Sequence, residues 1–225
     1  MDAIGNKIVV GNCLEGLGDM AIHMGEYREG EAYHLEALRV RRSIGHQVGI
    51  ATSIADLGTI ALFMCNYELA RERCQEALEA FQDFGEQVLA GYVLGKLGDI
   101  AIAVGDLQEA RSMYHSAMEI EVDSQHIPLC MNILTGVATL LVSAGESPLA
   151  MELVALVQNH PQIGPEAQLR AKKVFDKLKA KLPPDIIKEA QQRSQEREIL
   201  STAEEMLDWL ENVDLEKLVG DTGVS

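Results

Sequence analysis

Histidine and cysteine side chains are the groups of this sequence most suited to binding a metal ion. The chain has six histidines and four cysteines. A zinc site draws such residues from short, regular spacings, for example two cysteines a few residues apart. Here the histidines fall at unrelated positions, and no Cys or His pair has ligand spacing on one helical face. The sequence therefore predicts no metal site and no cofactor.

Catalysis by a phosphate-binding loop or an activated nucleophile is also not indicated. Gly91, Gly95 and Lys96 superficially match a phosphate-binding loop, but that loop needs a longer glycine spacing and a Ser or Thr after the Lys. The local sequence shows neither the strained turn nor the neighbouring base that activates a nucleophile. Carboxylates such as Glu72 and Glu76 fall at helical spacing, as on a solvent-exposed face. We expect no catalytic residue and no enzymatic activity.

The charge and the cysteine pattern limit the partners and the compartment. The formal net charge is -16, from 35 acidic and 19 basic residues, and it would repel the phosphate backbone of nucleic acids. The cysteines lack CxxC spacing, which favours reduced, intracellular thiols. No signal peptide is recognisable, and no run of roughly 18 apolar residues is present. We expect a cytoplasmic protein that binds neither nucleic acid nor membrane.

The elements that position these side chains follow from an internal repeat with a period of 40 residues. Leu17-Gly18 recurs as Leu57-Gly58 and as Leu97-Gly98, and the fourth copy has Val137-Ala138 at this place. Small residues keep the same period, namely Ala21, Ala61 and Ala101; Gly25, Gly105 and Gly145; and Ala37, Ala77 and Ala117. Four successive copies of one structural unit are therefore predicted.

Each copy is expected to form a helical hairpin. Leu14, Leu17, Gly18 and Ala21 share one face of a first helix, which Gly25 ends, and a second helical pattern follows. A glycine inside a helix costs about 1 kcal/mol, so a closely packed neighbouring helix must compensate for it. The four hairpins are predicted at about 8–45, 48–85, 87–123 and 126–160. His34 and Cys74 share one register position in the second helices, where packing accounts for both.

This pattern resembles the tetratricopeptide repeat, whose unit carries Leu-Gly and Ala in its first helix and spaced Ala positions in its second. The resemblance covers about residues 5 to 160. It implies an all-α protein, a right-handed superhelix (α-solenoid) with its concave side lined by the first helices. The usual unit has about 34 residues, so the additional residues are expected to lengthen the second helix and the link that follows it.

The segment 161–225 departs from the repeat and is predicted to be a C-terminal helical cap. Pro165 opens a basic helix, Pro183-Pro184 ends it and starts another, and Ser201-x-x-Glu204 is a capping box for a last helix. The last, acidic helix is expected to pack on the terminal repeats or on the basic helix.

The C-terminal segment carries a second resemblance. The order of His160-Pro161, a Lys-rich helix, Leu182-Pro183-Pro184-Asp185 and an acidic helix is similar to the C-terminal end of bacterial STAND-type signalling proteins, including LuxR-type activators. The resemblance implies repeats that sense an inducer or partner beside a nucleotide-binding switch. Ala3-Ile4-Gly5 aligns with the inter-repeat link at Ser43-Ile44-Gly45, so we expect a fragment of such a regulator.

The candidate binding residues are those that the repeat alignment places on the concave side. They differ between copies while the packing positions do not, as in a binding groove, although an idle solvent face would also vary. A protein or peptide partner, preferably basic, or a small polar inducer would suit this surface. The residues are Asn12, Glu15, Asp19 and His23; Thr52, Ala55, Thr59 and Phe63; Tyr92, Gly95, Asp99 and Ala103; and Asn132, Thr135, Thr139 and Ser143.

An architectural role is the alternative to ligand binding. In that case the repeats self-associate or dock onto another domain of the same protein. The contact would then involve the apolar residues of the open N-terminal end, Ile8, Val9 and Val10.

Overall fold

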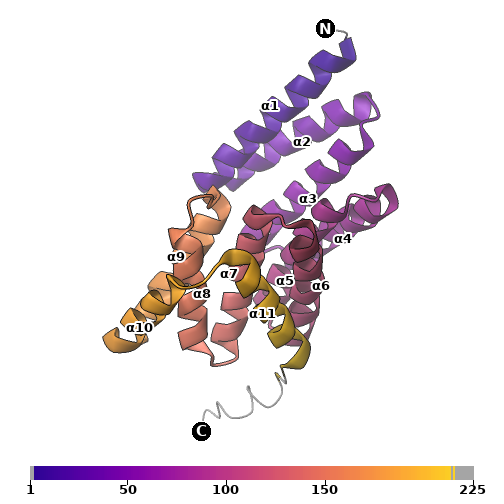
Figure 1. The fold of residues 1–225 in the computed structure, drawn as a ribbon. Coiled ribbons are helices and arrows are strands. Elements are labelled where there is room, and N and C mark those ends of the chain that lie inside the picture. Colours follow the sequence, from indigo (N-terminus) through magenta and orange to yellow (C-terminus); the bar gives the residue numbers. More distant parts are fainter. Residues whose placement is uncertain (1–2, 214, 216–225) are drawn as a thin grey trace. The chain divides into compact units, whose positions relative to one another are not determined.

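The computed structural model describes residues 3–213 and 215, and within them the chain forms α-helices and no β-strand (Figure 1). The all-α prediction is therefore confirmed. Several pairs of consecutive helices pack side by side in antiparallel orientation. They are α1 (Ala3–His23), α2 (Tyr27–Ser43), α3 (Gln47–Phe63), α4 (Tyr67–Phe84), α5 (Gln87–Val104), α6 (Leu107–Ser124), α7 (Ile127–Ser143), α8 (Ser147–Asn159), α9 (Pro165–Lys179), α10 (Pro184–Ser194) and α11 (Ile199–Asn212).

The helices belong to two compact units, residues 1–100 (unit 1) and 101–225 (unit 2), and the boundary lies within α5. In unit 1, α1 packs with α2, α3 packs with α4, and α2 also contacts α3. In unit 2, α7 packs with α8 and with α6. In unit 2 the last three helices pack directly on α6, α7 and α8.

Short left-handed turns connect the helices at the period seen in the sequence. The turn from a first to a second helix has a positive φ at Gly25, Gly105 and Gly145, and Cys65 adopts the same conformation in the second copy. The links between hairpins are only two or three residues long, as at 44–46 and 85–86. The links are therefore not lengthened as expected, and the additional residues of the period lie in helices of 17 or 18 residues.

The glycines inside the first helices lie where the second helix of the same hairpin approaches closely. A Cβ atom on Gly18 would lie 2.5 Å from the ring of His34, and one on Gly58 would lie 2.8 Å from the Cys74 sulfur. The predicted reason for mid-helix glycine is thereby confirmed in α1 and α3. Leu57 and Leu97, which follow the same pattern, are buried.

Helix α5 is the one described helix whose length and hydropathy would suffice to cross a membrane. Half of that window is buried inside the protein, and a buried core helix passes the same test of length and composition. Its apolar residues include Val93, Leu97 and Ile100, which are all buried.

The last three helices cover the end of unit 2. The basic helix α9 packs on α7 and α8, α10 packs on α8, and α11 packs on α6 and α7. The acidic last helix was expected to pack on the terminal repeats or on the basic helix, and in the structure it packs on the repeat helices α6 and α7. Helix α11 begins at Ile199 with Glu198 at its N-cap, so Ser201 lies in the first turn and does not cap the helix as predicted.

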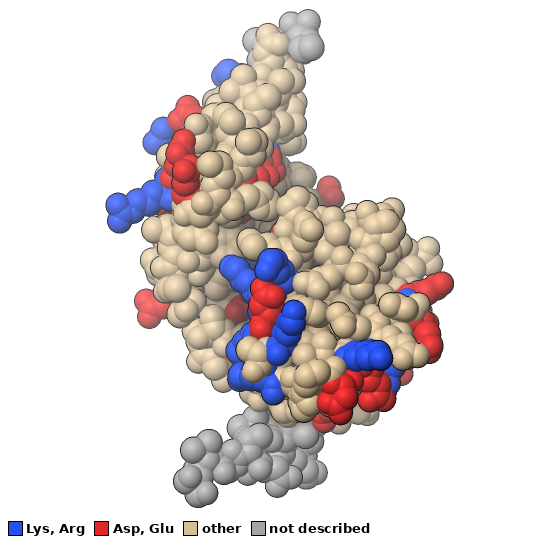
Figure 2. Space-filling model, turned by 90° about the vertical axis from the view of Figure 1, so that its left-hand side faces the viewer, with Lys and Arg blue, Asp and Glu red and all other residues tan. Residues whose placement is uncertain are grey.

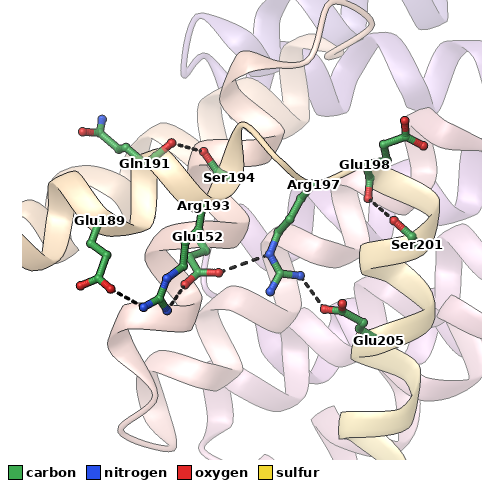
Figure 3. A network of polar contacts seen from close by, with 9 residues as sticks. All are labelled: Glu152, Glu189, Gln191, Arg193, Ser194, Arg197, Glu198, Ser201 and Glu205. Atoms are coloured by element: carbon green, nitrogen blue, oxygen red, sulfur yellow. Dashed lines mark hydrogen bonds and ion pairs between the residues drawn. The ribbon is translucent and has the colours of Figure 1, made fainter.

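Ion pairs centred on Glu152 hold these helices together (Figure 3). Glu152, on α8, is buried and pairs with Arg193 at 3.0 Å and with Arg197 at 3.3 Å. Arg197 also pairs with Glu205 of α11. At the other end of α11, Arg111 of α6 donates hydrogen bonds to two of the last main-chain carbonyl groups. A cation at a helix C-terminus is stabilising, because the exposed carbonyl groups carry partial negative charge.

Candidate partner-binding face

The structure places the predicted concave-face residues in different environments. Asn12, Asp19 and His23 of α1 are exposed, as are Ala103 and Ser143. Thr59 and Thr135 are buried, as is Ala55, and they are corrected as contact residues because neighbouring helices cover them. The partly exposed residues are Glu15, Thr52, Phe63, Tyr92, Gly95, Asp99, Asn132 and Thr139.

The hydroxyl groups of this set donate their hydrogen bonds within their own helices. Thr52 donates to the carbonyl of Val48 at 3.0 Å, and Thr139 donates to the carbonyl of Thr135 at 3.1 Å. Thr59, Thr135 and Ser143 make the same bond to the carbonyl four residues earlier. The hydroxyl oxygens of Thr52, Thr139 and Ser143, which are at least partly exposed, therefore offer a ligand acceptors and not donors.

Two of the predicted polar residues are bound by Arg41, a buried side chain of α2. Arg41 pairs with Glu15 and donates to Asn12 Oδ1 at 3.3 Å, so it fixes two side chains of α1. It also donates to Ser53 Oγ at 2.8 Å and to the Gly49 carbonyl at 3.2 Å, both on α3. Glu15 was predicted to attract a ligand, but it instead helps to hold three helices together.

His34 of α2 makes a second buried ionic cluster. Its ring lies between Asp19 of α1 and Asp56 of α3, with N···O distances of 3.5 Å and 3.4 Å. Burial alone lowers the pKa of His34, but the two carboxylates outweigh it and raise the pKa to about 9. The ring is thus protonated at neutral pH, and packing alone does not account for this residue as the sequence suggested.

Aromatic contacts involve two further residues of the predicted face. Phe63, at the end of α3, stacks on Tyr27 with ring centroids 5.5 Å apart. The ammonium group of Lys96 lies 4.9 Å from the ring centre of Tyr92, both on α5. A cation over an aromatic face is stabilising, so this contact favours one position of the partly exposed Tyr92 ring.

The second helices carry a different side chain at the His34 register in each hairpin. The residue is His34 in α2, Cys74 in α4 and Tyr114 in α6, and all three are buried. The residue that faces this side chain from the first helix of the following hairpin also differs between copies. In the first copy it is Asp56, which pairs with His34. Lys96 is at the same position of the next hairpin, and its positive charge lowers the pKa of the Cys74 thiol, although burial raises that pKa by more.

In unit 2 the same junction joins Tyr114 to a glycine. A Cβ atom on Gly136 would lie 2.6 Å from the Tyr114 ring, so only glycine leaves room for this aromatic side chain. Gly136 occupies the register of Asp56 and Lys96. The facing side chains are therefore complementary in both units: in charge for His34 and Asp56, and in volume for Tyr114 and Gly136.

Unit 2 also contains buried polar atoms that lack a partner within the part of the chain that the structure describes. Both carboxylate oxygens of Glu121 are of this kind, as is Oδ1 of Asn132. His126 Nδ1 lies 3.9 Å from Glu121 Oε2. Burial raises the pKa of Glu121 to about 8, so this carboxyl group holds a proton at neutral pH. The equivalent position of the repeat in unit 1, 80 residues earlier, is occupied by Arg41.

The cysteines and the acidic residues do not assemble into a metal site over residues 3–213 and 215. All four cysteines are free, and Cys13 and Cys65 are exposed. Burial raises the pKa of the Cys74 and Cys130 thiols to about 12, which keeps both protonated and unreactive.

Residues 11–83 match the family model of the tetratricopeptide repeat. The match begins within α1 and ends within α4, so it covers most of the first two hairpins. No curated protein matches the chain. The segment 11–83 is thus a tetratricopeptide repeat region, a kind of domain that generally mediates protein–protein interactions.

Proposed function

We propose that this chain is a protein-binding module and not an enzyme, and that the first-helix face of unit 1 binds a basic peptide segment of its partner. The observation that carries the proposal is the tetratricopeptide repeat match of residues 11–83. The fold presents successive first helices side by side, so that one extended segment of a partner contacts several of them.

The charge of unit 1 supports a basic partner. The carboxylate of Asp19 is 55% exposed although one of its oxygens pairs with His34. Asp99 is partly exposed on α5, and the aromatic ring of Tyr92 lies on the same helix. The chain as a whole carries a charge of -16, which accelerates the approach of a cationic segment. Glu15 and Thr59 no longer belong to this face.

The sequence resemblance supports a finer version of the proposal. In it, the module belongs to a cytoplasmic bacterial regulator of the STAND or LuxR type, and partner or inducer binding to the repeats controls a switch domain. The order of the prolines and the charged helices after His160 is the basis of this part.

The test is binding of a fluorescent lysine-rich peptide to the full chain, with a glutamate-rich peptide of the same length for comparison. The basic peptide should bind, and its affinity should fall as salt is added. Asp19→Asn with Asp99→Asn should weaken binding by about two- to thirtyfold, because an exposed charge pair contributes about 0.2–1 kcal/mol.

The matched control is Glu72→Gln with Glu79→Gln, which removes the same charge from exposed positions of α4 in the same unit. It should leave the affinity almost unchanged. An equal loss in both double variants would show that only the net charge attracts the peptide. The proposed face would then be wrong.

A further inference from the structure

Helix α1 and the residue that follows it carry an uncharged stripe that no described residue covers. Val10, Cys13, Leu17, Met20 and Met24 follow one another at alternating intervals of three and four residues, and each is exposed. This spacing places them along one face, as in the contact line of two packed helices. In Figure 2, the end of unit 1 beside the N-terminal residues is largely free of Lys, Arg, Asp and Glu.

The charged residues of α1 lie away from this stripe because they contact α2. Lys7 donates to Ser43 Oγ at 3.0 Å, Glu15 pairs with Arg41, and Asp19 lies beside His34. The expected contact at the open end, Ile8 to Val10, is thus only one end of a longer surface.

The registers of Cys13, Leu17 and Met20 are buried in the other first helices, whereas the register of Met24 is also exposed at Met64 and Val104. Leu17 is 45% exposed, whereas Leu57 and Leu97 are 2% and 4% exposed. Met20 is 62% exposed, whereas Ile60 is 1% exposed. Within unit 1, α3 lies against α2, the second helix of the preceding hairpin. The stripe of α1 continues this established interface, so the cover that fits it is a helix of the same kind.

Gly16 indicates which side chain that helix carries. A Cβ atom on Gly16 would meet nothing within 4 Å, and the open space beside this glycine, where other residues carry a side chain, is here called the notch. Gly136 has the same register 120 residues later, and there the notch is filled by the ring of Tyr114. The first helices with Asp56 or Lys96 at this register instead face His34 or Cys74. At this junction, a glycine on the first helix therefore goes with an aromatic ring on the second helix that packs against it.

A second copy of this chain does not supply that helix. The register that faces the notch is occupied by His34, Cys74, Tyr114 and Val154 in the four second helices, and each of these side chains is buried in its own molecule. Among the described residues, no second helix has this side chain free, and we take the occupant to be a helix of a partner protein.

We propose that the exposed stripe of α1 is a docking surface for an amphipathic helix of a partner, which inserts an aromatic side chain into the notch at Gly16 and covers Leu17 and Met20. The partner helix resembles the second helix of a tetratricopeptide hairpin. This contact is independent of the proposed binding of basic peptides, because it uses the opposite, uncharged residues of α1.

The experiment attaches the proposed occupant to the full chain. A copy of residues 87–126 is placed directly before Lys7 in place of residues 1–6, which preserves the period and brings the copied Tyr114 into register with Gly16. The probe adds no cysteine. Cys13 labelling by a maleimide should then slow at least about tenfold, because a covered thiol reacts only through local opening. Exposed Cys65 is the internal reference.

Two variants show whether the notch is responsible. Gly16→Leu should leave the original chain folded, since no atom lies near this position, but should restore fast Cys13 labelling in the extended chain. Replacing the copied Tyr114 by Ala should restore it in part. Fast labelling of Cys13 in the extended chain overturns the proposal. Slow labelling in the original chain with dimers in sedimentation, linked through Cys13 on oxidation, also overturns it in favour of a second copy.

Discussion

Unit 1 and unit 2 carry different kinds of side chain at equivalent positions of the repeat. In unit 1 the junction between the first two hairpins contains His34 with two carboxylates and Arg41 with Glu15. In unit 2 the equivalent junction contains the Tyr114 ring against Gly136. In the same unit, the carboxyl group of Glu121 is fully buried and lacks a hydrogen-bond partner among the described residues. A repeat scaffold thus requires complementary pairs, and it does not prescribe whether they are ionic or apolar.

The largest expected effect comes from removing the aromatic side chain of this junction. Tyr114→Ala should destabilise unit 2 by about 3–5 kcal/mol, because it leaves a cavity opposite Gly136. Cys74→Ala, at the same register in unit 1, should cost about 1 kcal/mol, because it removes one atom. Urea unfolding followed by Trp209 fluorescence reports on unit 2, which contains the single Trp. Hydrogen exchange in α3 and α4 reports on unit 1.

Equal losses in Tyr114→Ala and Cys74→Ala would contradict the comparison. They would mean that the volume at this register matters less than the identity of the repeat. Tyr114→Phe is the control, because it keeps the ring and removes only the hydroxyl group.

A pH titration should separate the units next. The pKa of Glu121 is about 8 in the folded protein and 4.5 ordinarily, so the folded state binds this proton more tightly. The resulting stability is fully present below pH 4.5 and is lost as the pH rises through 8, by about 1.4 kcal/mol per pH unit between these values. Glu121→Gln should flatten this slope in the Trp209 unfolding transition. An unchanged slope would show that another group controls unit 2.

The smallest expected effect is a shift in one titration in unit 1. The His34 ring should titrate near pH 9 by NMR, since its pKa is raised from 6.5 to about 9. The associated stability is present below pH 6.5 and is lost as the pH rises through 9. Asp19→Asn removes one of the two carboxylates and should lower this midpoint. A midpoint that does not move would leave Asp56 as the sole partner that matters.

Much of the fold could be predicted from the sequence because helical hairpins are local structures. Apolar spacing, left-handed turn glycines and mid-helix glycines recur every 40 residues, and each acts on neighbours within one copy. The helix at Ser201 was placed slightly late because Glu198, which lacks a side-chain capping bond, precedes it. Local capping signals therefore fix a helix end less reliably than its existence.

The candidate face was predicted less well because exposure depends on what packs over each helix. Thr59 and Asp19 share one register, yet Thr59 is buried and Asp19 is exposed. The repeat alignment predicts Glu15 as a ligand contact, because its ionic partner Arg41 is 26 residues away in the chain and the alignment does not show their contact. The aligned registers 41, 81 and 121, which hold Arg, Phe and Glu, were the signal that could have revealed this junction.

The sequence by itself determined the period, the helical hairpins, the acidic charge and the Pro-marked segment after residue 160, because each depends on residue type and spacing. The tertiary structure alone decided the ionic partners of His34 and Arg41, and it left the carboxyl oxygens of Glu121 without a hydrogen bond among the described residues. It also decided which apolar stripe stays uncovered on α1. Distance between helices sets these properties, and residues of similar type in the repeat pattern meet different neighbours when the hairpins stack.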